Sequence, residues 1–140
     1  MTDAPRLPDG ERLYAIGDVH GRDDLLARMY GLIDADLKRR APRRVTVVHL
    51  GDYVDRGPES RAAVERVRTC PWPSVALRGN HEELMLAALR HPGQAPLWLM
   101  NGGDATLESY GVAPEAGDAG MAALEEALPA DHRAFLEGLA

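Results

Sequence analysis

Cysteine is nearly absent from this chain of 140 residues, in which Cys70 is the only one. A single cysteine can form no internal disulfide and supplies no thiolate cluster for zinc, so we expect a protein of a reducing compartment, the cytoplasm. Long apolar runs are absent too, since no stretch approaches the roughly 20 residues that cross a bilayer and the N-terminus lacks the apolar segment of a signal peptide. The sequence therefore predicts no membrane partner.

Basic residues are fewer than acidic residues. Sixteen Lys and Arg residues stand against 22 Asp and Glu residues, which gives a formal net charge of -6. A general nucleic-acid binder needs a basic face to offset phosphate charge, so we expect no nucleic-acid partner. Any phosphate group that this protein handles must be bound locally, by a few residues.

The chain is long enough for one domain with a buried core, since 45% of its residues are hydrophobic. Residues 1–11 lack periodicity and are expected to form a flexible leader to a domain over residues 12–140. Expected strands cover residues 13–16, 45–50 and 74–77, and expected helices cover residues 25–37, residues 58–67 and the segment after the third strand. This alternation predicts an α/β fold with parallel strands, right-handed crossovers, and the first two strands buried on both faces.

Each expected strand runs into a polar turn. The turns are GDVHG (17–21), GDYVDRG (51–57) and GNHE (79–82). Ligands of an open parallel sheet bind beyond the carboxyl ends of its strands, so the three turns converge if the strands are neighbours. The side chains that would then meet are Asp18, His20, Asp52, Asp55, Arg56, Asn80 and His81.

Three carboxylates in such a cluster repel one another unless a cation neutralises them. Carboxylate, imidazole and amide ligands without thiolate suit divalent ions such as Mn, Fe or Zn. A centre with two such ions needs a bridging carboxylate, and Asp52, at the end of the middle strand, is the candidate. The alternative is a salt-bridged loop in which the charges satisfy one another.

The three motifs, in this order and with the third in the extended form ALRGNHEE, resemble those of the calcineurin-like metallophosphoesterases. More narrowly, they resemble the bacterial phosphoprotein (serine/threonine) phosphatase branch. The resemblance implies the calcineurin-like α/β/β/α sandwich, of which this chain would supply the first βαβαβα half. It also implies a metal-dependent phosphomonoester hydrolase with a binuclear metal centre and a metal-bound water as nucleophile. The substrate would be a phosphoprotein or a small phosphoester.

The resemblance also assigns roles to single residues. Asp18 and His20 would bind the first metal, Asp52 would bridge the two, and Asn80 would bind the second. The catalytic pair would be His81, as general acid, and Asp55, which holds it. The substrate phosphate would be bound by Arg56, together with Asn80.

Symmetrical dinucleoside tetraphosphatases share this scaffold and are the alternative function. They typically carry alanine at the position of Asp55 and aspartate at the position of Glu82, so both residues favour the protein phosphatase branch. The segment 96–111 is similar to a segment of phage-lambda-type phosphatases, with a structural or substrate-shaping role. The substrate stays open at this point.

The family completes its second metal site with two histidines from a later half, and residues after Tyr110 resemble no second set of strands. We therefore expect the N-terminal part of a longer phosphatase, with the C-terminal half absent and the second metal site incomplete. Such a chain would expose apolar surface and is expected to self-associate. A further alternative is a metal-binding or interaction module without catalysis.

Residues outside the turns are expected to have structural roles. We expect a packed or hydrogen-bonded His49, solvated His91 and His132, core or loop positions for Trp72 and Trp98, and bracing of the third turn by Arg78 and Glu82.

Overall fold

The computed structural model describes residues 4–114 and 117–140 and contains a parallel sheet of three strands in the order β1-β2-β3. The strands are β1 (Glu11–Ile16), β2 (Arg44–His49) and β3 (Ser74–Ala76). The longer helices are α1 (Asp23–Arg40), α2 (Ser60–Arg68), α3 (Asn80–Arg90), α6 (Gly117–Ala127) and α7 (Ala130–Glu137). Shorter helical pieces are η1 (Pro92–Gln94), α4 (Ala95–Trp98), η2 (Leu99–Gly103) and α5 (Asp104–Ser109). The expected parallel α/β order is confirmed.

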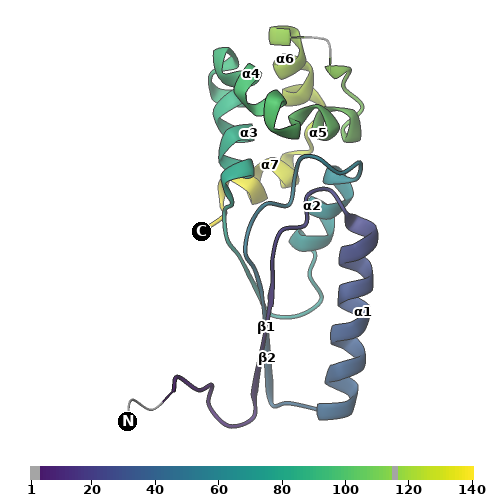
Figure 1. Ribbon diagram of the computed structural model, residues 1–140, viewed down its shortest axis with the longest axis vertical. Helices are drawn as coiled ribbons and strands as arrows, with labels where there is room; N and C mark the ends of the chain where they lie inside the picture. The colour runs from purple at the N-terminus through teal and green to yellow at the C-terminus, as the bar shows by residue number, and fades with distance from the viewer. Residues whose placement is uncertain (1–3, 115–116) are drawn as a thin grey trace.

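The sheet is covered on one face, so the expectation of strands buried on both faces is wrong. Val47 and His49 of β2 are fully buried, whereas Leu13 and Val75 are each 45% exposed. Two successive right-handed crossovers in the same direction place α1 and α2 on the same side of the sheet (Figure 1). Among the described residues no helix covers the other face, and self-association through it stays a prediction.

Helix α1 carries charges that match its dipole, with Asp23 and Asp24 in the first turn and basic residues in the last. Its buried residues Leu26, Tyr30 and Ile33 recur at helical spacing and pack toward the sheet. Tyr30 also contacts His49, whose Nε2 lies 2.8 Å from the phenol oxygen. This confirms the packed histidine, and burial lowers the pKa of His49.

The Asp36 carboxylate ties α1 to the edge strand β1. It accepts a hydrogen bond of 2.7 Å from the Tyr14 hydroxyl and lies 3.3 Å from Arg12 and 3.0 Å from Arg40. The Tyr14 hydrogen bond, followed by the charges of the two arginines, lowers the pKa of Asp36 below its ordinary value. The ionised form is therefore favoured more strongly in the folded chain than in the unfolded chain.

We expect Asp36→Asn to lower the Tm at neutral pH and to have no such effect in acid. A carboxyl group with a lowered folded pKa stabilises the fold above the ordinary aspartate pKa of about 3.9, and this contribution is lost as pH falls through the folded value. Thermal melts of both proteins across this range test the prediction. Asp34→Asn is the control, because Asp34 makes only an exposed pair with Lys38. A Tm difference independent of pH would contradict the prediction.

Helices α3 to α7 gather beyond the carboxyl ends of the strands (Figure 1). They share a core that includes fully buried Met85, Trp98, Leu124 and Leu136. None of the helices in residues 4–114 and 117–140 is long and apolar enough to span a membrane.

His132 lies in this helical region and is buried, so the expectation that it is solvated is wrong, whereas His91 is exposed as expected. The Nδ1 atom of His132 lies 2.8 Å from the Tyr110 hydroxyl and its Nε2 lies 2.9 Å from Glu65. Both partners are distant in sequence, so the local polar pattern around His132 could not indicate its burial.

Candidate active site

The first two turns are locked together by backbone hydrogen bonds. The N–H groups of Val19 and His20 both donate to the carbonyl of Asp52, at 3.0 and 2.9 Å. In the opposite direction, the N–H of Gly57 donates to the carbonyl of His20 at 3.0 Å. The turn at 17–21 is thereby fixed against the turn at 51–57, as their positions after adjacent strands require.

The second turn has an unusual backbone. The φ values are 57° at Asp52, 73° at Asp55 and 72° at Arg56. These values lie in the left-handed region, which residues other than glycine seldom adopt. Such strain persists only where surrounding contacts hold the backbone, and it clusters at functional sites.

Glu82 joins the second turn to the third. Its fully buried carboxylate accepts N–H hydrogen bonds from Asp52, Tyr53 and Val54, at 2.7, 2.7 and 3.2 Å, and from Gly79 at 2.9 Å. Burial raises the pKa of Glu82, while the four N–H donors act in the opposite direction. The expectation that Glu82 braces the third turn is confirmed, and the brace extends to the second turn.

Arg78 also braces this region, as expected, although it does so toward the end of the chain. Its guanidinium donates to the carbonyl of Glu137 at 2.7 Å and pairs with Glu83 at 3.1 Å. The start of α3 is therefore tied to the end of α7.

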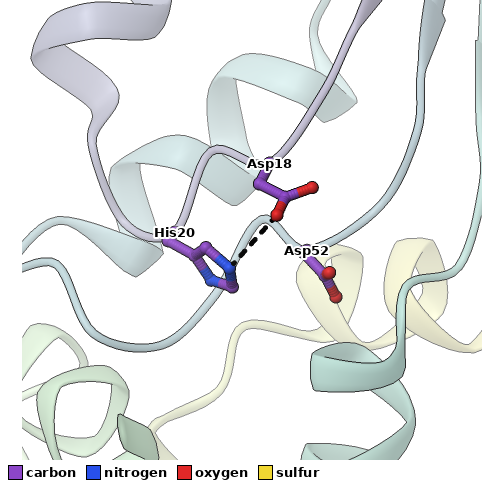
Figure 2. Close-up of side chains that lie close together, drawn as sticks. All are labelled: Asp18, His20 and Asp52. Carbon is purple, nitrogen blue, oxygen red and sulfur yellow. Dashed lines mark ion pairs between the residues drawn. The ribbon is translucent and has the colours of Figure 1, made fainter.

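Asp18, His20 and Asp52 each present one possible ligand atom, and these three atoms lie within 4.8 Å of one another (Figure 2). His20 Nε2 faces Asp18 at 3.7 Å. The other ring nitrogen, Nδ1, lies 3.0 Å from the carbonyl of Val54. Donation to that carbonyl leaves Nε2 as the free acceptor, which is the arrangement found for metal-ligating histidines.

Asn80 begins α3 and is exposed. The next residue, His81, donates its backbone N–H to the Asp52 carboxylate at 3.0 Å, which brings the start of the helix against the second turn. The third turn therefore lies beside the cluster of Asp18, His20 and Asp52.

The expected acid and its partner are in direct contact and buried. His81 Nδ1 lies 2.8 Å from Oδ2 of Asp55, and the residues are 3% and 0% exposed. The other ring nitrogen of His81 lies 3.4 Å from the guanidinium of Arg56, which is exposed. The His20 and His81 rings meet edge to face, with centroids 4.7 Å apart. The structure therefore places the His81–Asp55 pair next to the possible metal ligands.

Two residues outside the turns also bind Asp55. The indole N–H of Trp98 lies 3.0 and 2.9 Å from its two carboxylate oxygens, and the Thr106 hydroxyl donates to Oδ1 at 2.7 Å. Burial raises the pKa of Asp55, whereas hydrogen bonds from Thr106, His81 and Trp98 lower it. The expectation of a buried Trp98 is confirmed, but its link to Asp55 was missed. The signal available in the sequence was the segment 96–111.

A family model for the calcineurin-like phosphoesterases matches residues 11–124. The chain is 38% identical over 92 residues to serine/threonine-protein phosphatase 1 of Salmonella typhimurium, a match that covers 66% of this chain and 39% of the relative. It is 41% identical over 76 residues to the symmetrical bis(5'-nucleosyl)-tetraphosphatase of Paracidovorax citrulli, covering 54% of this chain and 25% of the relative.

A solved structure described as a candidate diadenosine tetraphosphatase has the same fold, with a TM-score of 0.50 at 23% sequence identity. The alignment covers 91% of this chain and 42% of that one. The chain thus spans less than half the length of each of these relatives.

Proposed function

The chain belongs to the calcineurin-like phosphoesterase family, and on this premise we propose that the protein is a metal-dependent phosphomonoester hydrolase of the serine/threonine phosphatase type. The observation that carries the proposal is the position of the buried His81–Asp55 pair directly beside Asp18, His20 and Asp52. This arrangement combines a possible cation site with a possible proton donor.

The donor set fits a divalent cation. Two carboxylates lie close to an imidazole whose Nδ1 faces a backbone carbonyl, so Nε2 remains available. We assign Asp18, His20 and Asp52 to the first ion, Asp52 also to a second, and Asn80 to the second, with Mn, Fe or Zn as the ions. Such ions, when bound, supply an activated water and stabilise negative charge on phosphorus oxygens.

The remaining residues bind the phosphate and handle a proton. Arg56 is exposed and its guanidinium can donate two parallel hydrogen bonds to phosphate oxygens. His81 has Nδ1 on Asp55, so its Nε2 is the atom that would deliver a proton to the departing oxygen. The Asp55 carboxylate fixes the ring and stabilises its protonated form.

Symmetrical hydrolysis of a dinucleoside tetraphosphate is the second candidate. It is favoured by the 41% identity to the Paracidovorax citrulli tetraphosphatase over 76 residues. The contact between Asp55 and His81 supports the monoesterase proposal instead, because a protonated leaving group matters most for a poor leaving group such as serine. A metal-binding module without catalysis is the third candidate.

We expect hydrolysis of a phosphoserine peptide that is lost after chelation and restored by Mn²⁺. The assay uses the longest open reading frame that contains these residues, because the chain spans 39% of the Salmonella phosphatase. Diadenosine tetraphosphate is tested in parallel, and calorimetry measures Mn²⁺ binding. A higher kcat/KM for the tetraphosphate would replace the proposal by the second candidate. Metal binding without hydrolysis of either compound would support the third.

A further inference from the structure

We propose that Trp98 and Thr106 are positioning residues for proton transfer, which hold the Asp55 carboxylate and through it the His81 ring in the orientation that catalysis needs. This inference rests on the proposed function, because it concerns the same proton donor. It extends that function to a segment, Ala95–Ser109, that lies outside the three turns.

Both carboxylate oxygens of Asp55 have hydrogen-bond partners, and the groups that contact them are buried. Trp98 and Thr106 are both fully buried, as is Asp55. Trp98 bonds both carboxylate oxygens, Thr106 bonds Oδ1, and His81 bonds Oδ2. Because Trp98 and Thr106 already hold the two oxygens, the Asp55 carboxylate has one orientation in which it can also accept a hydrogen bond from the His81 ring. Rotation of the Asp55 side chain would break several of these hydrogen bonds together.

The Trp98 indole is aimed at a charge. A buried tryptophan that only fills space still requires a partner for its N–H group. Here that partner is the carboxylate which contacts His81, rather than a nearby backbone carbonyl. A hydrogen bond to an ionised acceptor is about twice as strong as one between neutral groups, so Trp98 favours the ionised form of Asp55.

Thr106 holds the backbone as well as the side chain of Asp55. Its hydroxyl donates to the Asp55 carboxylate and accepts the Asp55 backbone N–H at 2.9 Å. The Ser60 hydroxyl, at the start of α2, lies 3.0 Å from both the Thr106 hydroxyl and the Asp55 nitrogen. These contacts secure a residue whose φ of 73° is unfavourable for a side chain.

The same segment holds the neighbouring residue, Arg56. The Arg56 N–H donates to the carbonyl of Gly102 at 3.0 Å, and Gly102 itself has a φ of 98°. At Gly102 a side chain would collide with the turn, since a Cβ atom there would lie 2.9 Å from the backbone nitrogen of Arg56. The segment Ala95–Ser109 therefore packs too closely on the Asp55–Arg56 turn for either position to shift independently.

Trp98→Phe tests the proposal because it removes the N–H group and keeps an aromatic ring. Loss of proton donation slows departure of a poor leaving group and leaves a good one nearly unaffected. We expect kcat for a phosphoserine peptide to fall about 30-fold, with little change in KM. This loss is a part of the rate enhancement that a general acid usually contributes. For dinitrophenyl phosphate, kcat should fall less than about threefold. Thr106→Val, which keeps the side-chain shape, should give the same pattern.

Two comparisons separate positioning from structural damage. In a His81→Asn background, Trp98→Phe should cause no further loss of kcat, because both changes act through one group. Trp72→Phe, at a partly buried tryptophan that packs edge to face against Tyr30, should leave the ratio of kcat for the two substrates unchanged. Equal losses on both substrates, or an additive loss with His81→Asn, would overturn the proposal.

A measurement without turnover keeps this inference distinct from the proposed function. NMR of the protein used in the kinetic assays should show a slowly exchanging Trp98 indole proton that shifts in Asp55→Asn, and His81 ring signals that shift in Trp98→Phe. Unchanged His81 signals in Trp98→Phe would overturn the positioning role whatever the activity. Shifted signals in a protein that hydrolyses no phosphoester would uphold the contact and overturn the proposed function together with the catalytic part of the inference.

Discussion

Asp52→Asn is expected to lower kcat/KM for metal-dependent phosphate release about 1000-fold, with weaker Mn²⁺ binding and a nearly unchanged Tm. Asp52 lies at the meeting point of the three turns and contributes one of the two clustered carboxylates. Removing its charge weakens the binding of ions that would each contribute several kcal/mol to stabilising the transition state, and about 4 kcal/mol corresponds to this factor.

We expect Asp52→Asn to disturb the fold very little. Asparagine is among the residues that best tolerate the left-handed backbone found at Asp52, where φ is 57°. Its amide oxygen can still accept the His81 N–H that the aspartate accepts at 3.0 Å. A loss of activity would therefore report the missing charge rather than a collapsed turn.

Kinetics with a phosphoserine peptide, calorimetry with Mn²⁺, and thermal melts together check this prediction. Asp34→Asn removes the same charge from the exposed side of α1 and should change none of the three measurements appreciably. An Asp52→Asn protein with kcat/KM within about fivefold of the original would exclude the metal-dependent mechanism that the site suggests.

The convergence of the turns was predictable because it follows from chain order. Once three parallel strands are neighbours, the residues after each strand lie at one edge, and Asp18, His20 and Asp52 indeed come together there. The inference needs only two local features of the sequence, the apolar runs that predict the strands and the polar turns that follow them. Their chemical roles remain predictions, which the proposed assays address.

The uncovered face of the sheet was not predicted from the strand pattern. Runs such as VTVV in β2 indicate burial on both sides, yet Val75, beside Val48 in the register, is 45% exposed. The apolar pattern of a strand records which surfaces suit burial and does not say which part of a molecule covers them. The strand order β1-β2-β3, which places both crossover helices on one side, is visible only in the structure.

Contacts between distant segments were also hidden. Asp55 and Thr106 are 51 residues apart, and His132 and Glu65 are 67 residues apart. Without the fold, Trp98 could be recognised as a core residue but not as a hydrogen-bond donor to a particular carboxylate. Sequence patterns identify buried residues more readily than the polar partners that burial requires.

Glu82→Ala is expected to lower the free energy of unfolding by about 3 kcal/mol, because several buried N–H groups lose their acceptor together. This is the largest stability effect among the substitutions proposed. The donors belong to two turns, Asp52 to Val54 in one and Gly79 in the other. The substitution also removes the cost of burying a carboxylate, and this offsets part of the lost stability. Each orphaned buried donor costs about 1–3 kcal/mol, so the sum exceeds this offset even if water reaches some of them.

Glutamine should not restore the stability. Its carbonyl oxygen can replace one carboxylate oxygen, but its amide group would then point N–H bonds at the remaining backbone N–H groups. Glu83→Ala is the matched control, because Glu83 lies in the same turn of α3 and makes exposed pairs with Arg78 and Arg90. That substitution should cost no more than about 1 kcal/mol, as measured by denaturant unfolding.

Glu82 should also control metal binding without being a ligand. It holds the backbone N–H of Asp52, so its loss weakens the link between the second and third turns and allows the strained φ of 57° to relax. We therefore expect Glu82→Ala to weaken Mn²⁺ binding measured well below its Tm, while Glu83→Ala leaves the affinity unchanged. Equal stability and equal affinity in the two variants would mean that the buried carboxylate does not join the turns. The position of Asp52 would then depend on its other contacts, the backbone pairing with Val19 and His20 and the hydrogen bond from the His81 N–H.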